Sequence, residues 1–298
     1  MKKTEIGENF PFESKFLEVK GSRMHYIDEG QGNPILFIHG NPTSSYIWRN
    51  IIPYVTEDSR AIAVDLIGFG KSDKPAIDYG FTDSYAYLEA FIEKLGLKDI
   101  ILVVQDWGSG LGFHYANTHR ENIRGIAFME AMYEQKDWNK LTPSLKMAFT
   151  MIQSKPLSWL MLGVGNQFIK KMLPDGIVRK LSPQEMETYA APFKTLKSRK
   201  PSYVFPRDVP IKNKPAHTAE AVNNYNYWLQ ETPIPKLMFY ADPGMLIPIE
   251  EVPWIEKNFP NLTSIKLGKG IHFVQEDHPH TIGAGLKKWI KSLVQSKL

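Results

Sequence analysis

The chain has 298 residues, a net charge of +4 and 43% hydrophobic residues, which suits one large globular domain or a domain with an insertion. It contains no cysteine, so disulfides, thiolate catalysis and cysteine-based metal sites are excluded. The lysines are scattered and no run of about 18 consecutive apolar residues occurs, so we expect neither a nucleic-acid nor a membrane partner. Residues 1–12 lack the apolar core of a secretory signal, which makes a cytoplasmic protein the expectation.

Short apolar runs rich in β-branched residues predict the strands of a sheet. Two runs of alternating polarity on either side of Gly21 and Ser22 suggest a hairpin at its edge. Further strands are expected at residues 34–38, 60–64, 100–104, 124–129, 236–240 and 262–267. Helical spacing of apolar residues predicts helices at residues 47–52, 83–95, 107–119 and 279–293. This alternation indicates a doubly wound, mostly parallel sheet.

The pattern changes between residues 131 and 230. Runs of β-branched residues disappear, prolines recur, and bulky apolar residues follow helical spacing. We therefore expect a helical cap at residues 131–230, inserted into a core made of residues 1–130 and 231–298.

The residues around Asp106 have the pattern of a nucleophile elbow, in which a buried strand turns sharply into a helix. Asp106 replaces the serine of the usual G-x-S-x-G pattern and Gln105 replaces its first glycine, while Gly108 and Gly110 are expected to keep the turn tight. An aspartate at this place can cap the helix. It can also attack a saturated carbon that carries a leaving group, or a strained ring, and form an ester.

Hydrolysis of such an ester needs a base, and His272 lies on a glycine-containing loop after the last predicted strand. The acid that orients this histidine is either Glu130 or Asp242, since each ends a predicted strand and the spacing does not choose between them. Asn41 and Asp106 also follow strands directly, so all these side chains are expected to meet at the carboxyl ends of the strands, beneath the cap.

Two side chains offer donors to a leaving group. Trp107 has an indole N–H and Asn41 an amide N–H₂, and such donors in a dry pocket suit a halide. The backbone N–H groups of the same residues could instead form an oxyanion hole for ester hydrolysis.

Five stretches of the chain resemble haloalkane dehalogenases of the α/β-hydrolase fold, in the same order: residues 37–46, 65–73, 105–109, 128–130 and 271–277. The resemblance implies an aspartate nucleophile at Asp106, a base at His272, an acid at Glu130 rather than Asp242, and a halide-binding pair. That pair is Asn41 and Trp107. Apolar residues at matching positions are expected to line the substrate pocket: Phe149, Phe168, Phe205, Leu246 and Phe273.

The implied reaction converts a haloalkane into an alcohol, a halide ion and a proton, with no metal or organic cofactor. A monomer or a homodimer is expected. The chain departs from the family near Trp138, which lacks its usual acidic, proline-containing surroundings, and at Gly176, where a larger residue often stands at the tunnel mouth. Both departures concern the preferred substrate size and leave the catalytic set intact.

Other functions remain open at this point. Epoxide hydrolases share the elbow and need cap tyrosines, of which the chain has several: Tyr133, Tyr189, Tyr203, Tyr225 and Tyr227. Coelenterazine luciferases resemble the same subgroup and keep the same catalytic set. A fluoroacetate-type dehalogenase would need a nearby arginine, and none lies between Arg60 and Arg120. A non-catalytic binding module of this fold tends to lose the nucleophile or the base, whereas both are present here.

Overall fold

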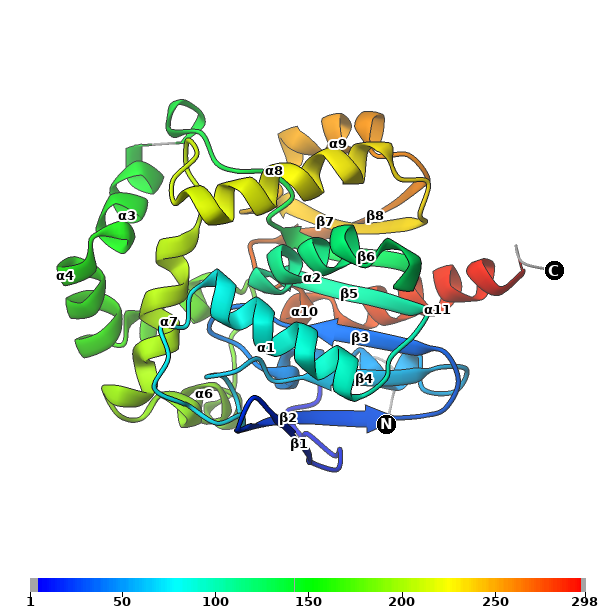
Figure 1. Ribbon diagram of the computed structural model, residues 1–298, viewed down its shortest axis with the longest axis horizontal. Helices are drawn as coiled ribbons and strands as arrows, with labels where there is room; N and C mark the ends of the chain where they lie inside the picture. The colour runs from blue at the N-terminus through cyan, green and yellow to red at the C-terminus, as the bar shows by residue number, and fades with distance from the viewer. Residues whose placement is uncertain (1–4, 142, 296–298) are drawn as a thin grey trace.

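The computed structural model describes residues 5–141 and 143–295 (Figure 1). An eight-stranded sheet in the order β1-β2-β4-β3-β5-β6-β7-β8 runs through its centre. Only β2 runs antiparallel to its neighbours, and the remaining pairs are parallel. The strands are β1 (Lys15–Val19), β2 (Ser22–Glu29), β3 (Pro34–Ile38), β4 (Arg60–Val64), β5 (Ile100–Asp106), β6 (Ile123–Ala131), β7 (Lys236–Pro243) and β8 (Leu262–Gly270).

Two apolar layers cover the two faces of this sheet. On one face α1 (Phe81–Lys94), α2 (Trp107–Thr118) and α8 (Ala216–Glu231) pack on the strands, joined by α9 (Val252–Asn258). On the other face the core is completed by α11 (Pro279–Gln295). The central strands are apolar at nearly every position because both of their faces are buried, as in other parallel sheets. The predicted α/β-hydrolase fold is thereby confirmed.

The chain between β6 and β7 is helical and lies beyond the carboxyl ends of the parallel strands (Figure 1). Its helices are α3 (Pro143–Gln153), α4 (Lys155–Ser158), α5 (Leu173–Asp175), α6 (Pro183–Ala190), α7 (Lys200–Val204) and α8. Two π-helical segments, η5 (Trp159–Val164) and η6 (Phe168–Met172), continue the helices around them. The short helix α10 (Val274–Asp277) follows β8.

Some predicted elements differ from the observed ones. The helix expected at residues 47–52 is two short 3₁₀ turns, η1 (Ser45–Trp48) and η2 (Ile52–Tyr54). Pro53 has no N–H group with which to continue an α-helical ladder there. The strands also extend beyond their apolar runs. Asp106, Glu130 and Asp242 therefore lie at the carboxyl ends of β5, β6 and β7 rather than in the loops that follow. None of the helices in residues 5–141 and 143–295 combines the length and the apolar composition of a membrane span.

Candidate active site

Asp106 stands at the strained junction of β5 and α2. Its φ of 49° and ψ of −129° are unusual for a residue with a side chain, as expected at an elbow. Asp106 occupies the position of a helix cap, but its side chain makes no capping hydrogen bond. The alternative in which this aspartate simply caps α2 is therefore not supported.

Two glycines let other chain segments approach the elbow. A Cβ atom at Gly108 would lie 2.2 Å from the carbonyl oxygen of Ile38, and one at Gly40 would lie 2.2 Å from Asp106 Oδ1. The sequence predicts that Gly108 and Gly110 keep the turn tight, and the lack of room for a Cβ atom at Gly108 fits that prediction. Neither has a positive φ, because the positive φ falls on Asp106, and the glycines serve instead for close packing.

Three titratable side chains meet at the carboxyl ends of the strands. His272 Nε2 lies 3.5 Å from Asp106 Oδ2, and His272 Nδ1 lies 3.2 Å from Glu130 Oε2. Asp106 Oδ1 accepts a hydrogen bond of 2.8 Å from the backbone N–H of Asn41. Glu130 and His272 are buried, whereas Asp106 keeps slight exposure. The arrangement has the form of a nucleophile, base and acid in a line.

The carboxylate beside the histidine is Glu130, and Asp242 lies elsewhere. Glu130 Oε2 also accepts backbone hydrogen bonds from Met245 at 3.0 Å and Leu246 at 2.8 Å, which fix its orientation. Asp242 is half exposed and lies 3.7 Å from the ammonium group of Lys266. The geometry therefore separates the two carboxylates that sequence spacing left equivalent.

Opposing influences act on the pKa of His272. Its burial lowers the pKa, but the hydrogen bonds and negative charges of Asp106 and Glu130 outweigh burial and raise the pKa to about 9. The protonated imidazolium is thus favoured while Asp106 is ionised. Loss of the Asp106 charge would remove part of this stabilisation and release the imidazole as a base.

The two predicted halide ligands flank the nucleophile. Trp107 is buried and stacks on Phe205 of the cap, with ring centroids 4.2 Å apart. Asn41 is buried as well, and its Nδ2 donates to the carbonyl oxygen of Ser202 in α7 at 3.3 Å. One amide hydrogen of Asn41 is left for another acceptor.

The apolar residues predicted to line the pocket fall into two groups. Phe205 covers Trp107, and the ring of Phe273 makes an edge contact with His272, their centroids 4.5 Å apart. The backbone of Leu246 binds Glu130. Phe149 in α3 and Phe168 in η6 are half-buried within the cap helices, and their part in a pocket stays a prediction.

Comparison with known proteins agrees with this geometry. Residues 33–279 match the model of the alpha/beta hydrolase fold family. A haloalkane dehalogenase from Sphingobium indicum is 44% identical over 95% of this chain and 97% of its own length. One from Mesorhizobium japonicum is 40% identical over 93% of this chain and 91% of its own.

The chain belongs to the haloalkane dehalogenase family. Solved structures agree: haloalkane dehalogenase DbeA from Bradyrhizobium elkani superposes with a TM-score of 0.93 at 38% identity, covering 96% of this chain and 99% of that one. A putative ancestral haloalkane dehalogenase gives a TM-score of 0.92 at 42% identity, with 94% and 99% covered. The protein is therefore a hydrolase of the haloalkane dehalogenase type, and the family predicted from the sequence is confirmed.

Sequence reasoning missed two contacts of the histidine in this haloalkane dehalogenase. Gln105 is fully buried, and its Nε2 lies 3.1 Å from His272 Nε2. In the sequence, Gln105 was noted only because it stands where the elbow pattern has a glycine. An amide at the end of a buried strand, next to the nucleophile, was itself a signal, because a buried amide needs hydrogen-bond partners. The carbonyl oxygen of Gly176 accepts hydrogen bonds from the backbone N–H groups of both His272 and Phe273, each at 3.0 Å. Gly176 thus ties the cap to the loop of the base.

Three of the five cap tyrosines named for an epoxide hydrolase have hydroxyls that bind other groups, and the ring of Tyr203 packs on the guanidinium of Arg207. The hydroxyl of Tyr225 donates to the carbonyl of Met132, and that of Tyr133 donates to Glu251. Tyr189 donates to the buried Glu276, and Tyr227 is largely exposed. These contacts do not favour the epoxide hydrolase alternative. Asp65, in the loop after β4, is likewise occupied, since it accepts from His25 at 2.8 Å and from two backbone N–H groups, and these contacts brace the turn.

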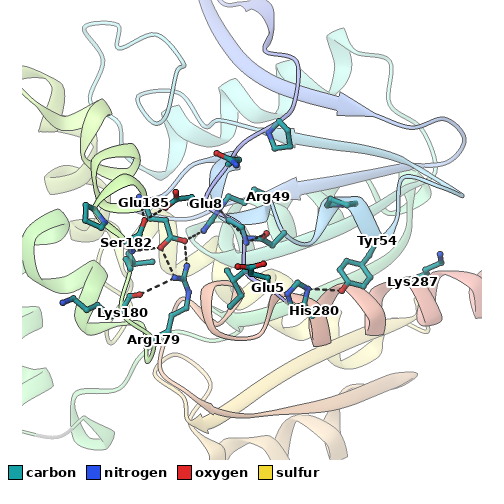
Figure 2. Close-up of a pocket in the computed structure, with 18 of the residues that line it drawn as sticks. Glu5, Glu8, Arg49, Tyr54, Arg179, Lys180, Ser182, Glu185, His280 and Lys287 are labelled. Atoms are coloured by element: carbon teal, nitrogen blue, oxygen red, sulfur yellow. Dashed lines mark hydrogen bonds and ion pairs between the residues drawn. The ribbon is translucent and has the colours of Figure 1, made fainter. Parts of the chain in front are cut away.

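A buried ion cluster clamps the cap of this dehalogenase onto the loop that follows His272 (Figure 2). Arg49, next to η1, donates to Glu185 in α6 at 2.6 Å, a contact that Figure 2 shows, and to Glu276 in α10 at 2.7 Å. Arg179 also reaches both glutamates, and its backbone N–H binds Asp277 at 2.9 Å. A cleft of about 960 Å³ lies beside the cluster, and none of the three candidate catalytic residues lines it. In the described residues, no group of three histidine or carboxylate side chains is arranged to hold a metal ion.

We expect Arg49→Met to destabilise the fold strongly. It would leave the carboxylates of Glu185 and Glu276 buried with less compensation, and breaking such a buried pair costs about 3–5 kcal/mol. Urea unfolding should show a large fall in the midpoint. The matched control is Lys171→Met, which breaks an exposed pair with Asp175 and should leave the midpoint unchanged. Equal midpoints for both variants would contradict the clamp.

Proposed function

We propose that this haloalkane dehalogenase works through an alkyl ester on Asp106. The observation that carries the proposal is the pair of contacts made by His272, 3.5 Å to Asp106 on one side and 3.2 Å to Glu130 on the other. In the first step a carboxylate oxygen of Asp106 displaces halide from carbon in line. The carbon–oxygen bond forms as the carbon–halogen bond breaks, and the halide leaves with the bonding electrons.

In the second step His272 takes a proton from a water that attacks the ester carbonyl of Asp106. Glu130, fixed by two backbone hydrogen bonds, stabilises the imidazolium that results. The tetrahedral intermediate places negative charge on an oxygen of Asp106 itself. The backbone N–H of Asn41, which already donates to Asp106 Oδ1 at 2.8 Å, supports that charge.

The departing halide would be held by the indole N–H of Trp107 and the amide of Asn41. Both side chains are buried and flank Asp106, and both offer N–H donors. The buried ring of Phe205, stacked on Trp107, makes this end of the site apolar. These features support a site for an ion that leaves a dry pocket.

The remaining assignments complete the proposal. A cap at residues 131–230 would roof the site on a core of residues 1–130 and 231–298, with an apolar pocket between them. The substrate is a small halogenated alkane and the products are an alcohol and a halide ion. A cytoplasmic location and a monomeric or homodimeric state stay predictions from the sequence.

An isotope experiment tests the ester. With enzyme in excess over a bromoalkane in heavy-oxygen water, a single turnover should give an alcohol that carries ordinary oxygen, because the oxygen comes from Asp106. Mass spectrometry of the peptide that contains Asp106 should then show the heavy isotope in its carboxylate. Heavy oxygen in the first alcohol formed would mean direct attack by water and would overturn the ester mechanism, while leaving the dehalogenase activity untouched.

A pH prediction follows from the charge on Asp106. In the free enzyme the pKa of His272 is raised to about 9, so the imidazolium dominates at neutral pH and is lost as the pH rises through 9. Esterification neutralises Asp106, so the pKa of His272 falls and hydrolysis of the ester should rise through a pKa below 9. Histidine NMR titrations of the wild type and of Asp106→Asn, which also lacks the charge, should show the lower pKa in the variant. The same pKa in both proteins would contradict the coupling.

A further inference from the structure

One helical segment of the cap has an apolar face turned to solvent. α4 continues into η5, and along this segment Leu157, Trp159, Leu160 and Val164 are between 41% and 55% exposed. The inward positions of the same segment, such as Ser158, are buried. A surface helix of a globular protein normally shows the reverse pattern, with polar residues outward. The fold itself therefore leaves the apolar side chains on the outer side of this segment in contact with solvent.

The neighbouring elements enlarge this surface. Leu196 is 42% exposed and lies against η5, since a Cβ atom at Gly163 would be 3.4 Å from its Cδ1. In Figure 1, α4 and α3 form the end of the molecule that lies farthest from the sheet. We call the combined surface the apolar cap patch: Leu157, Trp159, Leu160, Val164 and Leu196.

Cations surround the apolar cap patch. Arg199 donates to the carbonyl oxygens of Gly163 at 3.0 Å and Val164 at 3.3 Å, and Arg207 donates to the carbonyl of Lys155 at 3.2 Å. Lys197 follows Leu196 directly. Residues 131–230 as a whole carry 15 lysines and arginines against 7 aspartates and glutamates. The segment that carries the patch thus has an excess of cations, whereas the rest of the chain has a small excess of carboxylates.

We propose that the apolar cap patch docks the protein on an anionic lipid surface. Tryptophan and aliphatic side chains enter the boundary between headgroups and acyl chains, and the surrounding cations are attracted to anionic headgroups. A second copy of the chain would place its own cations against these, so its charge does not complement the patch. The sequence led us to expect no membrane partner because the chain has no spanning segment, and docking at the surface needs none.

Docking in this orientation would turn the cap toward the lipid, in which apolar haloalkanes concentrate. The enzyme would then meet substrate at the membrane as well as in water. The proposal is independent of the chemistry at Asp106, because it concerns how the protein is positioned and not how it reacts.

Vesicle sedimentation tests the proposal. The protein should bind vesicles of phosphatidylcholine with phosphatidylglycerol about tenfold or more tightly than vesicles of phosphatidylcholine alone, and added salt should weaken that binding. The double variant Trp159→Ser with Leu160→Ser should lose the binding. Tyr227→Ser, which removes an aromatic ring that is 69% exposed on α8, is the matched control and should keep it.

A variant that reverses one charge beside the patch tests whether anionic lipid is what binds there. Lys155→Glu should reduce the preference for phosphatidylglycerol while leaving halide release from 1,2-dibromoethane in buffer unchanged, which shows that the variant is folded. Absence of binding to either vesicle, or equal binding to both, would overturn the proposal. So would a dimer in solution that the double variant converts into a monomer, because the patch would then be an interface between copies.

Discussion

His272→Phe is expected to release one equivalent of halide per active site and then to stop. Attack by Asp106 on carbon needs no base, so the first step survives the loss of the imidazole. The second step loses the group that activates water and that lies 3.5 Å from the nucleophile. Because general base catalysis contributes about 10²–10⁴-fold, the steady-state kcat should fall by at least that factor. Rapid-quench measurement of bromide gives the burst amplitude.

The trapped ester provides a second readout. Intact mass spectrometry of His272→Phe after exposure to a bromoalkane should show the mass of the protein plus one alkyl group. The matched control is His217→Phe, since His217 is half exposed in α8 and its Nε2 lies 3.5 Å from Asp208, which has no part in the proposed mechanism, so this variant should turn over normally. A variant at His272 that forms alcohol steadily, or one that releases no halide burst at all, would contradict the role assigned to this base.

The nucleophile and the base could be predicted from the sequence because each is rare in its local setting. An aspartate replaces serine in an elbow pattern, and a histidine follows the last strand on a glycine-containing loop. The acid could not be derived from the residues alone, because Glu130 and Asp242 both end parallel strands. Only the lateral order of the strands and the loop after β7 decide which carboxylate turns toward His272.

Other contacts near the site could not be predicted from the sequence, because they join segments that are far apart along the chain. Arg49 and Glu276 are 227 residues apart, and nothing in either neighbourhood marks them as partners. The contact between Gly176 and the His272 loop uses a backbone carbonyl, for which the sequence carries no signal. Strand positions, by contrast, could be predicted well because burial on both faces requires apolar runs. The predicted strands end before the observed ones, because backbone pairing continues through polar residues such as Asp106.

Glu130→Gln should reduce kcat by about 10⁴-fold, by analogy with removal of the negative charge from the acid of other catalytic triads. Glu130 Oε2 accepts from His272, Met245 and Leu246 at once, so the carboxylate both orients the imidazole and stabilises its protonated form. The amide removes the charge, and the pKa of His272 should fall with it. As with the base, the halide burst should survive and the ester should accumulate, since the loss falls on the second step.

Asp242→Asn is the matched control, because it makes the same change at the other candidate acid. Asp242 is half exposed and lies 3.7 Å from Lys266, so screening by solvent makes the pair weak and kcat should stay within about twofold of the wild type. Urea unfolding of both variants shows whether either loss reflects a damaged fold. If Asp242→Asn abolished turnover while Glu130→Gln retained it, the acid would be Asp242, and the loop after β7 would have to rearrange in the working enzyme to bring that carboxylate to His272.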